Sequence, residues 1–226
     1  MRLAIWGIVW LSLKVSVVAV VAMLPIAFGI ALLLARVRFP GKLLVDGIIH
    51  LPLVLPPVVT GWLLLLAFAP SGPLGAPLNA IGVSLMFRWT GAAVAAGVMS
   101  LPLMVRAIRL SLEAVDRKLE GAARTLGASP LRVFRTITLP LALPGVWAGA
   151  VLGFARSLGE FGATITFVSN IPGETQTLPI AIYSALQVPG SDALVARLAG
   201  ISVLLSLGAL LVSEWLSRRG GGGHVI

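Results

Sequence analysis

Two ionisable residues lie four positions apart inside a long apolar stretch of the chain. Arg156 and Glu160 interrupt the run from Leu143 to Val168, and on one helix this spacing places both side chains on the same face, where they can pair. Ionisable groups within an apolar span are costly and usually face a polar interior, so a functional role is the default hypothesis. Arg156 would offer positive potential to a passing dianion, while Glu160, which would repel it, would hold the arginine in place or exchange with it during gating. The alternative is a pair at the outer membrane interface that only locks helices together.

Prolines concentrate in an earlier apolar run, from Ile48 to Ala69. Each proline removes a backbone donor and loosens a helix, and in lipid the freed carbonyls are tolerated only where protein or a water-filled cavity satisfies them. The run is therefore either part of a path or gate, or a kink packed against neighbouring helices. The candidates for the path or gate, taken from both runs, are Pro52, Pro56, Pro57, Thr60, Arg156, Glu160 and Thr164.

An arginine-rich segment, EGAARTLGASPLRVFRTITLP at 120–140, separates two apolar runs. Apolar residues recur at spacings of three and four from Leu112 to Leu126, which predicts one face of an amphipathic helix. Gly127 suits the position just past a helix end. Ser129 followed by Pro130 then predicts a second helix start.

This segment has two interpretations. An amphipathic helix can lie on the lipid surface, held by anionic headgroups, or the segment can contact another protein. The tight turn and the second helix start favour a protein contact, because a lipid anchor needs neither. A helix-turn-helix between two spans is a rigid knob that suits a partner's groove and can pass its motion into the membrane. Prolines within 139–145 are expected to interrupt the helix before the next span.

The composition places the chain in the membrane class. It has 226 residues, of which 58% are hydrophobic and 11% charged, and its mean hydropathy is +1.03. With no cysteine and two histidines, disulfides, thiolate nucleophiles and thiolate metal sites are excluded, and a histidine metal centre is not indicated. The net charge of +9 suits membrane topology better than nucleic acid, because the basic residues lie beside apolar runs.

Five segments approach or exceed the roughly 20 apolar residues that a membrane-spanning helix needs. A sixth short span, either before Lys14 or within Leu178–Val188, remains open. Most lysines and arginines fall in the first and third connections and in the tail, which predicts an outside N-terminus and a cytoplasmic C-terminus. The tail at 218–226 is expected to be flexible. The five expected spans are Leu13–Ala35, Ile48–Ala69, Gly91–Val105, Leu143–Val168 and Leu198–Leu216.

Residues of the arginine-rich segment follow a known spacing. This spacing resembles the EAA signature of permease subunits of bacterial ABC importers, with Gly121 standing where the family has alanine. The resemblance implies that the cytoplasmic loop, 113–138, carries a coupling helix that docks on the ATP-hydrolysing subunit. The matching positions, which the resemblance implies to be ATPase-coupling residues, are Glu120, Ala122, Ala123, Gly127, Ile137, Leu139 and Pro140.

Two further stretches, 50–61 and 156–175, resemble the oxyanion permeases within this group. The match is fullest for molybdate permeases and looser for sulfate and tungstate permeases. It implies that residues 1–226 form a single transmembrane permease domain in the inner membrane, of all-α fold, which moves an oxyanion by ATP-driven alternating access. Molybdate is the expected cargo, and a sulfate, thiosulfate or tungstate permease is the alternative.

The expected partners follow from the same resemblance. They are an ABC ATPase, a second copy of the chain, an external oxyanion-binding protein and membrane lipid, without nucleic acid. The chain lacks a GxxxxGK[ST] phosphate loop, so we expect no catalytic residue, cofactor or metal of its own, and ATP and Mg would bind the partner ATPase. An integral membrane enzyme is disfavoured because no catalytic constellation is apparent. A membrane scaffold that recruits a cytoplasmic protein through 113–138 is a further alternative.

Overall fold

The computed structural model describes residues 2–220, with side chains from 5 to 211, so most of the tail expected at 218–226 lies outside the described residues. All regular secondary structure in this part of the chain is helical. The helices in chain order are α1 (Arg2–Arg36), α2 (Lys42–Val54), α3 (Pro57–Phe68), α4 (Gly75–Ala80), α5 (Trp89–Ala114), α6 (Arg117–Thr125), α7 (Pro130–Val133), the π-helix η1 (Phe134–Thr138), α8 (Leu139–Leu158), α9 (Gly162–Val168), α10 (Leu178–Leu186) and α11 (Asp192–Gly220).

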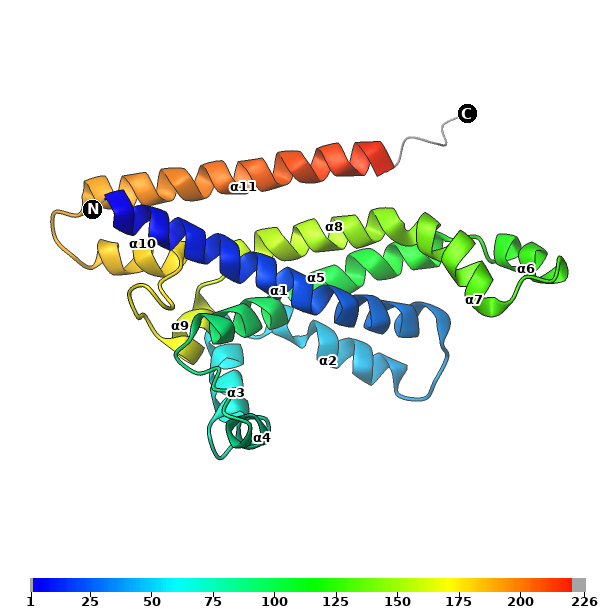
Figure 1. Cartoon of the computed structure of the whole chain (residues 1–226), viewed down its shortest axis with the longest axis horizontal. Helices are drawn as coiled ribbons and strands as arrows, with labels where there is room; N and C mark the ends of the chain where they lie inside the picture. The colour runs from blue at the N-terminus through cyan, green and yellow to red at the C-terminus, as the bar shows by residue number, and fades with distance from the viewer. Residues whose placement is uncertain (1, 221–226) are drawn as a thin grey trace.

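The long helices α1, α5, α8 and α11 run along the length of the molecule (Figure 1). Helix α5 is the central element, since it packs against both α1 and α8. Its buried positions are mostly alanine, glycine and methionine, and small residues allow helix backbones to approach closely in a membrane. Helices α6 and α7 form a projection at one end, and α3 and α4 project near the other (Figure 1).

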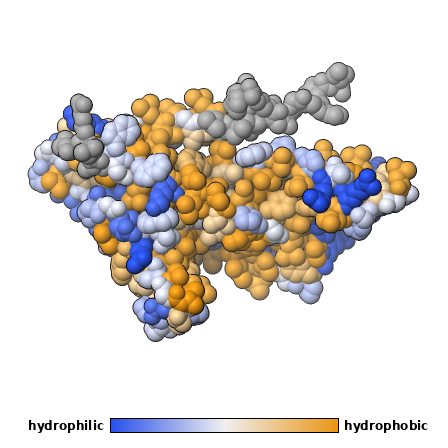
Figure 2. Space-filling model, viewed as in Figure 1, coloured by the Kyte–Doolittle hydropathy of each residue, from blue (hydrophilic) through white to orange (hydrophobic). Residues whose placement is uncertain are grey.

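The described helices confirm the predicted membrane class. Four are long and apolar enough to cross a membrane, and the bent pair α2–α3 makes up to five if it is one span. Figure 2 shows apolar side chains across the middle of the molecule and hydrophilic ones toward its ends. Neither place considered for a sixth span contains a separate long helix, because α10 has only 9 residues and the residues before Lys14 belong to α1.

Two expected spans are broken in the structure. The second is divided into α2 and α3, whose axes differ by 116°. The fourth, expected to be one helix from Leu143 to Val168, ends at Leu158 and resumes as α9. Glycines at 159 and 162 weaken the helix between them, and the Glu160 carboxylate accepts a hydrogen bond from the Ala163 N–H at 2.9 Å. The Glu160 side chain thus caps the start of α9. The expectation of one continuous helix from Leu143 to Val168 is therefore wrong.

Two local expectations near the arginine-rich segment are also wrong. The prolines of 139–145 do not interrupt a helix, because Pro140 lies in the first turn of α8, where its missing N–H is not needed, and the wider π-helix η1 precedes it. The amphipathic pattern from Leu112 to Leu126 is not one helix either. Asp116 accepts a hydrogen bond from the Lys118 N–H at 2.8 Å and starts α6 as a new helix.

Gly145, Gly149 and Gly153 recur at a spacing of four residues, which predicts a small-residue face for close helix contact. In the structure this face of α8 packs against α5. A Cβ atom on Gly149 would lie 3.1 Å from Ile108 Cγ1, and one on Gly153 would lie 2.7 Å from the sulfur of Met104. A Cβ atom on Gly145 would collide with Ser111 Cβ and lie 3.0 Å from the Ala107 carbonyl oxygen. The three glycines are therefore required for space, and they set the distance between the two central helices.

Replacing Gly145 with alanine is expected to destabilise the chain by about 1–3 kcal/mol, because backbone and a short side chain must move to admit the methyl group. Thermal unfolding of the purified protein in detergent measures the effect. Gly29→Ala is the matched control, since nothing lies within 4 Å of a Cβ atom there. Equal unfolding temperatures for the two variants would contradict the assigned packing.

Candidate functional site

The two broken spans meet at their breaks. A Cβ atom on Gly162, the first residue of α9, would lie 2.8 Å from the Cβ atom of Pro57, the first residue of α3. One turn further along α3, a Cβ atom on Gly61 would lie 2.6 Å from the carbonyl oxygen of Ala163. The backbones of α3 and α9 thus approach so closely that only glycine fits between them. We call this contact the α3–α9 crossing.

The proline and threonine candidates fall on or near this crossing. The bend follows Leu55, which has an extended conformation, and Pro56 and Pro57 start α3. Pro52 lies inside α2 and does not break it. Thr60 in α3 and Thr164 in α9 are both buried, and the hydroxyl oxygen of Thr60 has no hydrogen-bond partner among the described residues. Pro52 therefore lies away from the crossing, and the other four candidates lie on or near it. These four are Pro56, Pro57, Thr60 and Thr164.

Arg156 and Glu160 pair, but not on one helix. Arg156 lies in the last turn of α8, and Glu160 lies in the break before α9. Their Nη1 and Oε2 atoms are 2.5 Å apart, and the other carboxylate oxygen caps α9 through Ala163. The Glu160 side chain is 2% exposed and that of Arg156 27%. Both oxygens of the Glu160 carboxylate are therefore bonded within the protein, while the Arg156 guanidinium remains partly accessible next to the crossing.

At the opposite end of the long helices, the arginine-rich segment forms the predicted helix-turn-helix. Gly127 has φ +83°, a left-handed conformation that favours glycine, although a Cβ atom would meet nothing within 4 Å. The Ser129 hydroxyl accepts a hydrogen bond from the Arg132 N–H at 3.3 Å and caps α7. The predicted helix end at Gly127 and helix start at Ser129 are confirmed. We call residues 116–138 the knob.

The knob has an inner and an outer side. Glu120 is buried on the inner side, where it contacts Arg36 of α1 and Thr138 of η1. Leu126 is 88% exposed on the outer side. Burial does not assign the other positions of the EAA pattern to one side of the knob. Ala122, Gly127 and Pro140 are exposed, and Ala123, Ile137 and Leu139 are partly buried. The outer side also carries the exposed leucines Leu119 and Leu131.

The partners of Glu120 could not be identified from the sequence pattern. Arg36 is 84 positions away and Thr138 is 18 away, so only the packing of α1 beside the knob brings them together. A second polar cluster was missed as well. Arg109 of α5 donates a hydrogen bond to Asp46 of α2 at 3.1 Å and one to Glu113 at 2.8 Å, beside a cavity of about 340 Å³. The spacings of four between Asp46 and His50, and between Arg109 and Glu113, could have indicated it.

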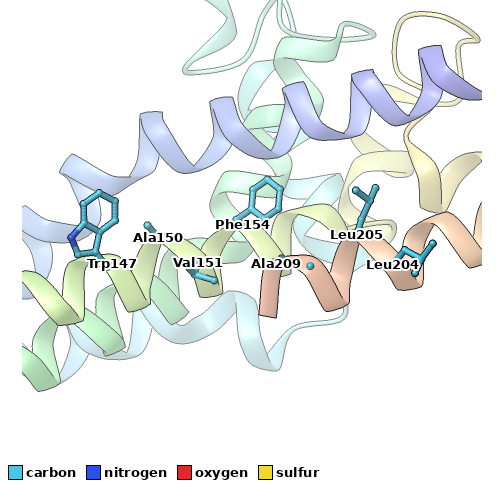
Figure 3. A pocket seen from close by; sticks show the side chains of 8 residues that line it. Trp147, Ala150, Val151, Phe154, Leu204, Leu205 and Ala209 are labelled. Atoms are coloured by element: carbon cyan, nitrogen blue, oxygen red, sulfur yellow. The ribbon is translucent and has the colours of Figure 1, made fainter. Parts of the chain in front are cut away.

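An apolar groove of about 470 Å³ lies between α8 and α11 (Figure 3). Trp147 and Phe154 of α8 and Leu204 and Leu205 of α11 contribute its largest side chains. The lining includes no ionisable residue. Apart from the indole N–H of Trp147, its side chains are apolar, so the groove differs in chemistry as well as in place from the α3–α9 crossing.

Apolar spans, a crossing of two broken helices and a polar knob make up a membrane-embedded helical subunit, and its fold is similar to that of ABC transporters of known structure. The MetNI methionine ABC transporter, solved in inward-facing conformations, shares this fold with a TM-score of 0.75 and 19% identity over 97% of each chain. A bacterial ABC transporter involved in alginate import aligns with a TM-score of 0.74 and 18% identity over 94% of this chain and 78% of that chain.

The chain belongs to the family of binding-protein-dependent transport system inner membrane components, whose model matches residues 8–220. The predicted family and the inner-membrane, multi-pass location are therefore confirmed. The chain is 60% identical over 214 residues to the molybdenum transport system permease protein ModB of Escherichia coli (strain K12), and the match covers 94% of this chain and 93% of that one. The ModB protein of Haemophilus influenzae is 61% identical over 210 residues and 92% of each chain. The sulfate transport system permease protein CysT of Salmonella typhimurium is 36% identical over 197 residues, 85% of this chain and 71% of that one.

Proposed function

We propose that the chain is the permease subunit of an ABC importer that carries molybdate across the inner membrane. The observation that carries this proposal is the 60% identity to a molybdenum permease over nearly the whole length of both chains, against 36% for a sulfate permease. The matched region includes both segments that form the α3–α9 crossing. A sulfate, thiosulfate or tungstate cargo is the alternative, since these anions share charge and tetrahedral shape with molybdate.

The crossing is proposed to be the gate of the anion path. The partly exposed guanidinium of Arg156 lies beside the crossing and would attract a dianion. The buried Glu160 carboxylate would keep this guanidinium in position through their ion pair. Two half-helices in contact at their breaks can change angle without disrupting the long helices, which suits alternating access. Proline at the start of α3 favours the bend, because it leaves no donor to continue α2.

The complete transporter is proposed to hold two copies of the chain, two ATPase subunits and an external binding protein. Two identical permeases place the path near a two-fold axis. The N-terminus would face outside and the knob the cytoplasm, consistent with the Lys and Arg bias of the connections. ATP and Mg would bind the ATPase subunits, which drive transport by closing on nucleotide and moving the two knobs.

Uptake by the reconstituted complex tests the cargo. Permease, ATPase and binding protein in liposomes with internal ATP are expected to take up molybdate. Tungstate should compete with molybdate at similar concentration, and sulfate only at a concentration at least about tenfold higher, equivalent to about 1.4 kcal/mol of preference. Uptake of sulfate in preference to molybdate would assign the chain to the alternative. ATPase binding without uptake of any of the three anions would support the scaffold function.

Replacing Leu126 with glutamate is expected to lower copurification of the ATPase by about tenfold or more, while the permease remains in the membrane. The leucine is 88% exposed on the outer side of the knob, and a buried, unpaired carboxylate at an interface is strongly unfavourable. Leu74→Glu is the control, because this half-exposed leucine lies in the connection between α3 and α4, away from the knob. Unchanged binding by Leu126→Glu would place the ATPase contact elsewhere.

A further inference from the structure

Arg36, the last residue of α1, holds the knob through a partly buried ion pair with Glu120. Its Nη2 atom donates a hydrogen bond to Glu120 Oε1 at 2.8 Å, and its Nη1 atom donates one to Oε2 at 3.3 Å. The Thr138 hydroxyl donates a third bond to Oε1 at 2.6 Å. A guanidinium that meets both oxygens of a carboxylate fixes orientation as well as distance. The three residues, which we call the clamp, join α1, α6 and the helix that continues into α8.

We infer that Arg36 is a positioning residue for the coupling helix, and that Glu120 acts inside the permease and not as a contact to the ATPase. This inference rests on the proposed function, since it concerns how the knob passes ATPase movement to the spans. It assigns to Glu120 a role different from the docking role that the EAA resemblance implies. It adds Arg36, which lies outside the EAA segment, and Thr138, which lies within that segment at a position the pattern does not specify.

Burial separates the clamp from the docking surface. Glu120 is 9% exposed, whereas its neighbour Leu119 is 50% exposed and Leu126 is 88% exposed. Three of the roughly four acceptor positions of a carboxylate are already used by Arg36 and Thr138. A partner that covers the leucines can therefore bind the outer side of α6 while Glu120 remains bonded on the inner side.

The joints of α6 explain why it needs such a clamp. The helix is separated from α5 by the extended residues Val115 and Asp116, and from α7 by the turn at Gly127. Both joints can change their dihedral angles without breaking a long helix. A push on α6 would turn it about these joints unless a buried contact transmits the force. The clamp transmits it to α1 and α8 together, because Arg36 ends one and Thr138 immediately precedes the other.

Charge exchange tests the inference in the assembled transporter. Arg36→Glu and Glu120→Arg are each expected to retain ATPase copurification but to reduce the amount of anion imported per ATP hydrolysed by about tenfold or more. The exchanged pair, Arg36→Glu with Glu120→Arg, should recover most of this ratio, because the opposite charges face each other again. Arg38→Glu is the matched control, since this arginine is exposed two positions beyond α1. It should leave the ratio unchanged.

Thr138→Val supplies a milder test that does not reverse a buried charge. It removes one hydrogen bond to Glu120 while leaving the ion pair, so the import ratio should fall by about two- to fivefold, equivalent to about 0.4–1 kcal/mol, which is in the lower range for the net contribution of one hydrogen bond. Thr136→Val is its control, because that hydroxyl is exposed and bonds only to the Arg132 carbonyl oxygen of its own helical turn. Equal ratios for the two valine variants would contradict the role of Thr138.

Trypsin cleavage tests the clamp without the ATPase. In inside-out membrane vesicles that hold only the permease, Arg36→Glu should speed cleavage at Arg117, Lys118 and Arg124, because proteolysis follows the open population of a segment. Arg38→Glu should not. If Arg36→Glu cleaves like the unaltered chain, or if Glu120→Arg alone abolishes ATPase binding while Arg36→Glu retains it, Glu120 is a docking contact and the inference is overturned. If the unaltered permease binds no ATPase, the proposed function fails, and the cleavage result still decides the clamp.

Discussion

Replacing Arg156 with leucine is expected to destabilise the permease by about 3–5 kcal/mol, because it leaves the Glu160 carboxylate buried without its counter-ion. Replacing Glu160 with glutamine should have a smaller effect, of about 1–2 kcal/mol. The amide oxygen can still accept the bond from the Ala163 N–H, and the partly accessible guanidinium of Arg156 can turn toward water. Thermal unfolding in detergent and the amount of protein in the membrane measure this asymmetry.

The double variant Arg156→Leu with Glu160→Gln separates stability from transport. Without either charge, most of the lost stability should return, since no buried ion is left unpaired. Anion uptake should nevertheless fall by about tenfold or more, because the positive potential beside the crossing is gone. Arg197→Leu is the control, as this arginine is exposed on α11. Full uptake by the double variant would mean that the pair only locks α8 to α9.

Replacing Gly61 with alanine is expected to reduce uptake by about tenfold or more and to destabilise the chain by at least about 1–3 kcal/mol. The added methyl group would lie 2.6 Å from the Ala163 carbonyl oxygen and 2.9 Å from the Ala163 Cα atom. Both are backbone atoms, so relief requires α3 and α9 to separate. Uptake by the reconstituted complex and thermal unfolding report the two effects.

Gly47→Ala is the matched control for Gly61→Ala. Gly47 lies in α2, the other half of the same broken span, and a Cβ atom there meets nothing within 4 Å. The alanine should leave uptake unchanged and favour the helix by up to about 1 kcal/mol. If Gly61→Ala transports as well as this control, close contact between α3 and α9 is not needed for the gate.

Features set by local chemistry were predictable from the sequence. The apolar runs are long enough to identify the membrane class, and a glycine followed by a serine and a proline is enough to locate the turn of the knob. The small-residue spacing on α8 correctly indicated a packing face. In each case the information lies within one continuous segment of the chain.

Features set by a competing side chain or by tertiary packing were not predictable in the same way. The run from Leu143 to Val168 is apolar apart from Arg156 and Glu160, and nothing in this pattern reveals that Glu160 turns back to cap α9. The EAA pattern identified Glu120 but not its orientation, because its partner Arg36 lies at the end of another span. A periodic pattern predicts that residues share a face, and the structure decides what that face contacts.

Helix α2 differs from its neighbours in how it is held. None of its residues is buried, it meets α3 at 116°, and its ion pair from Asp46 to Arg109 is partly exposed. Helices α1, α5 and α8, by contrast, share an apolar core of buried residues, against which α2 packs only the partly buried Val45 and Ile49. Opening α2 exposes less buried surface than opening a core helix, so we expect its local free energy of opening to be lower. We therefore expect the chain to unfold in steps, with a single transition temperature reporting the core and not the segment next to the proposed gate.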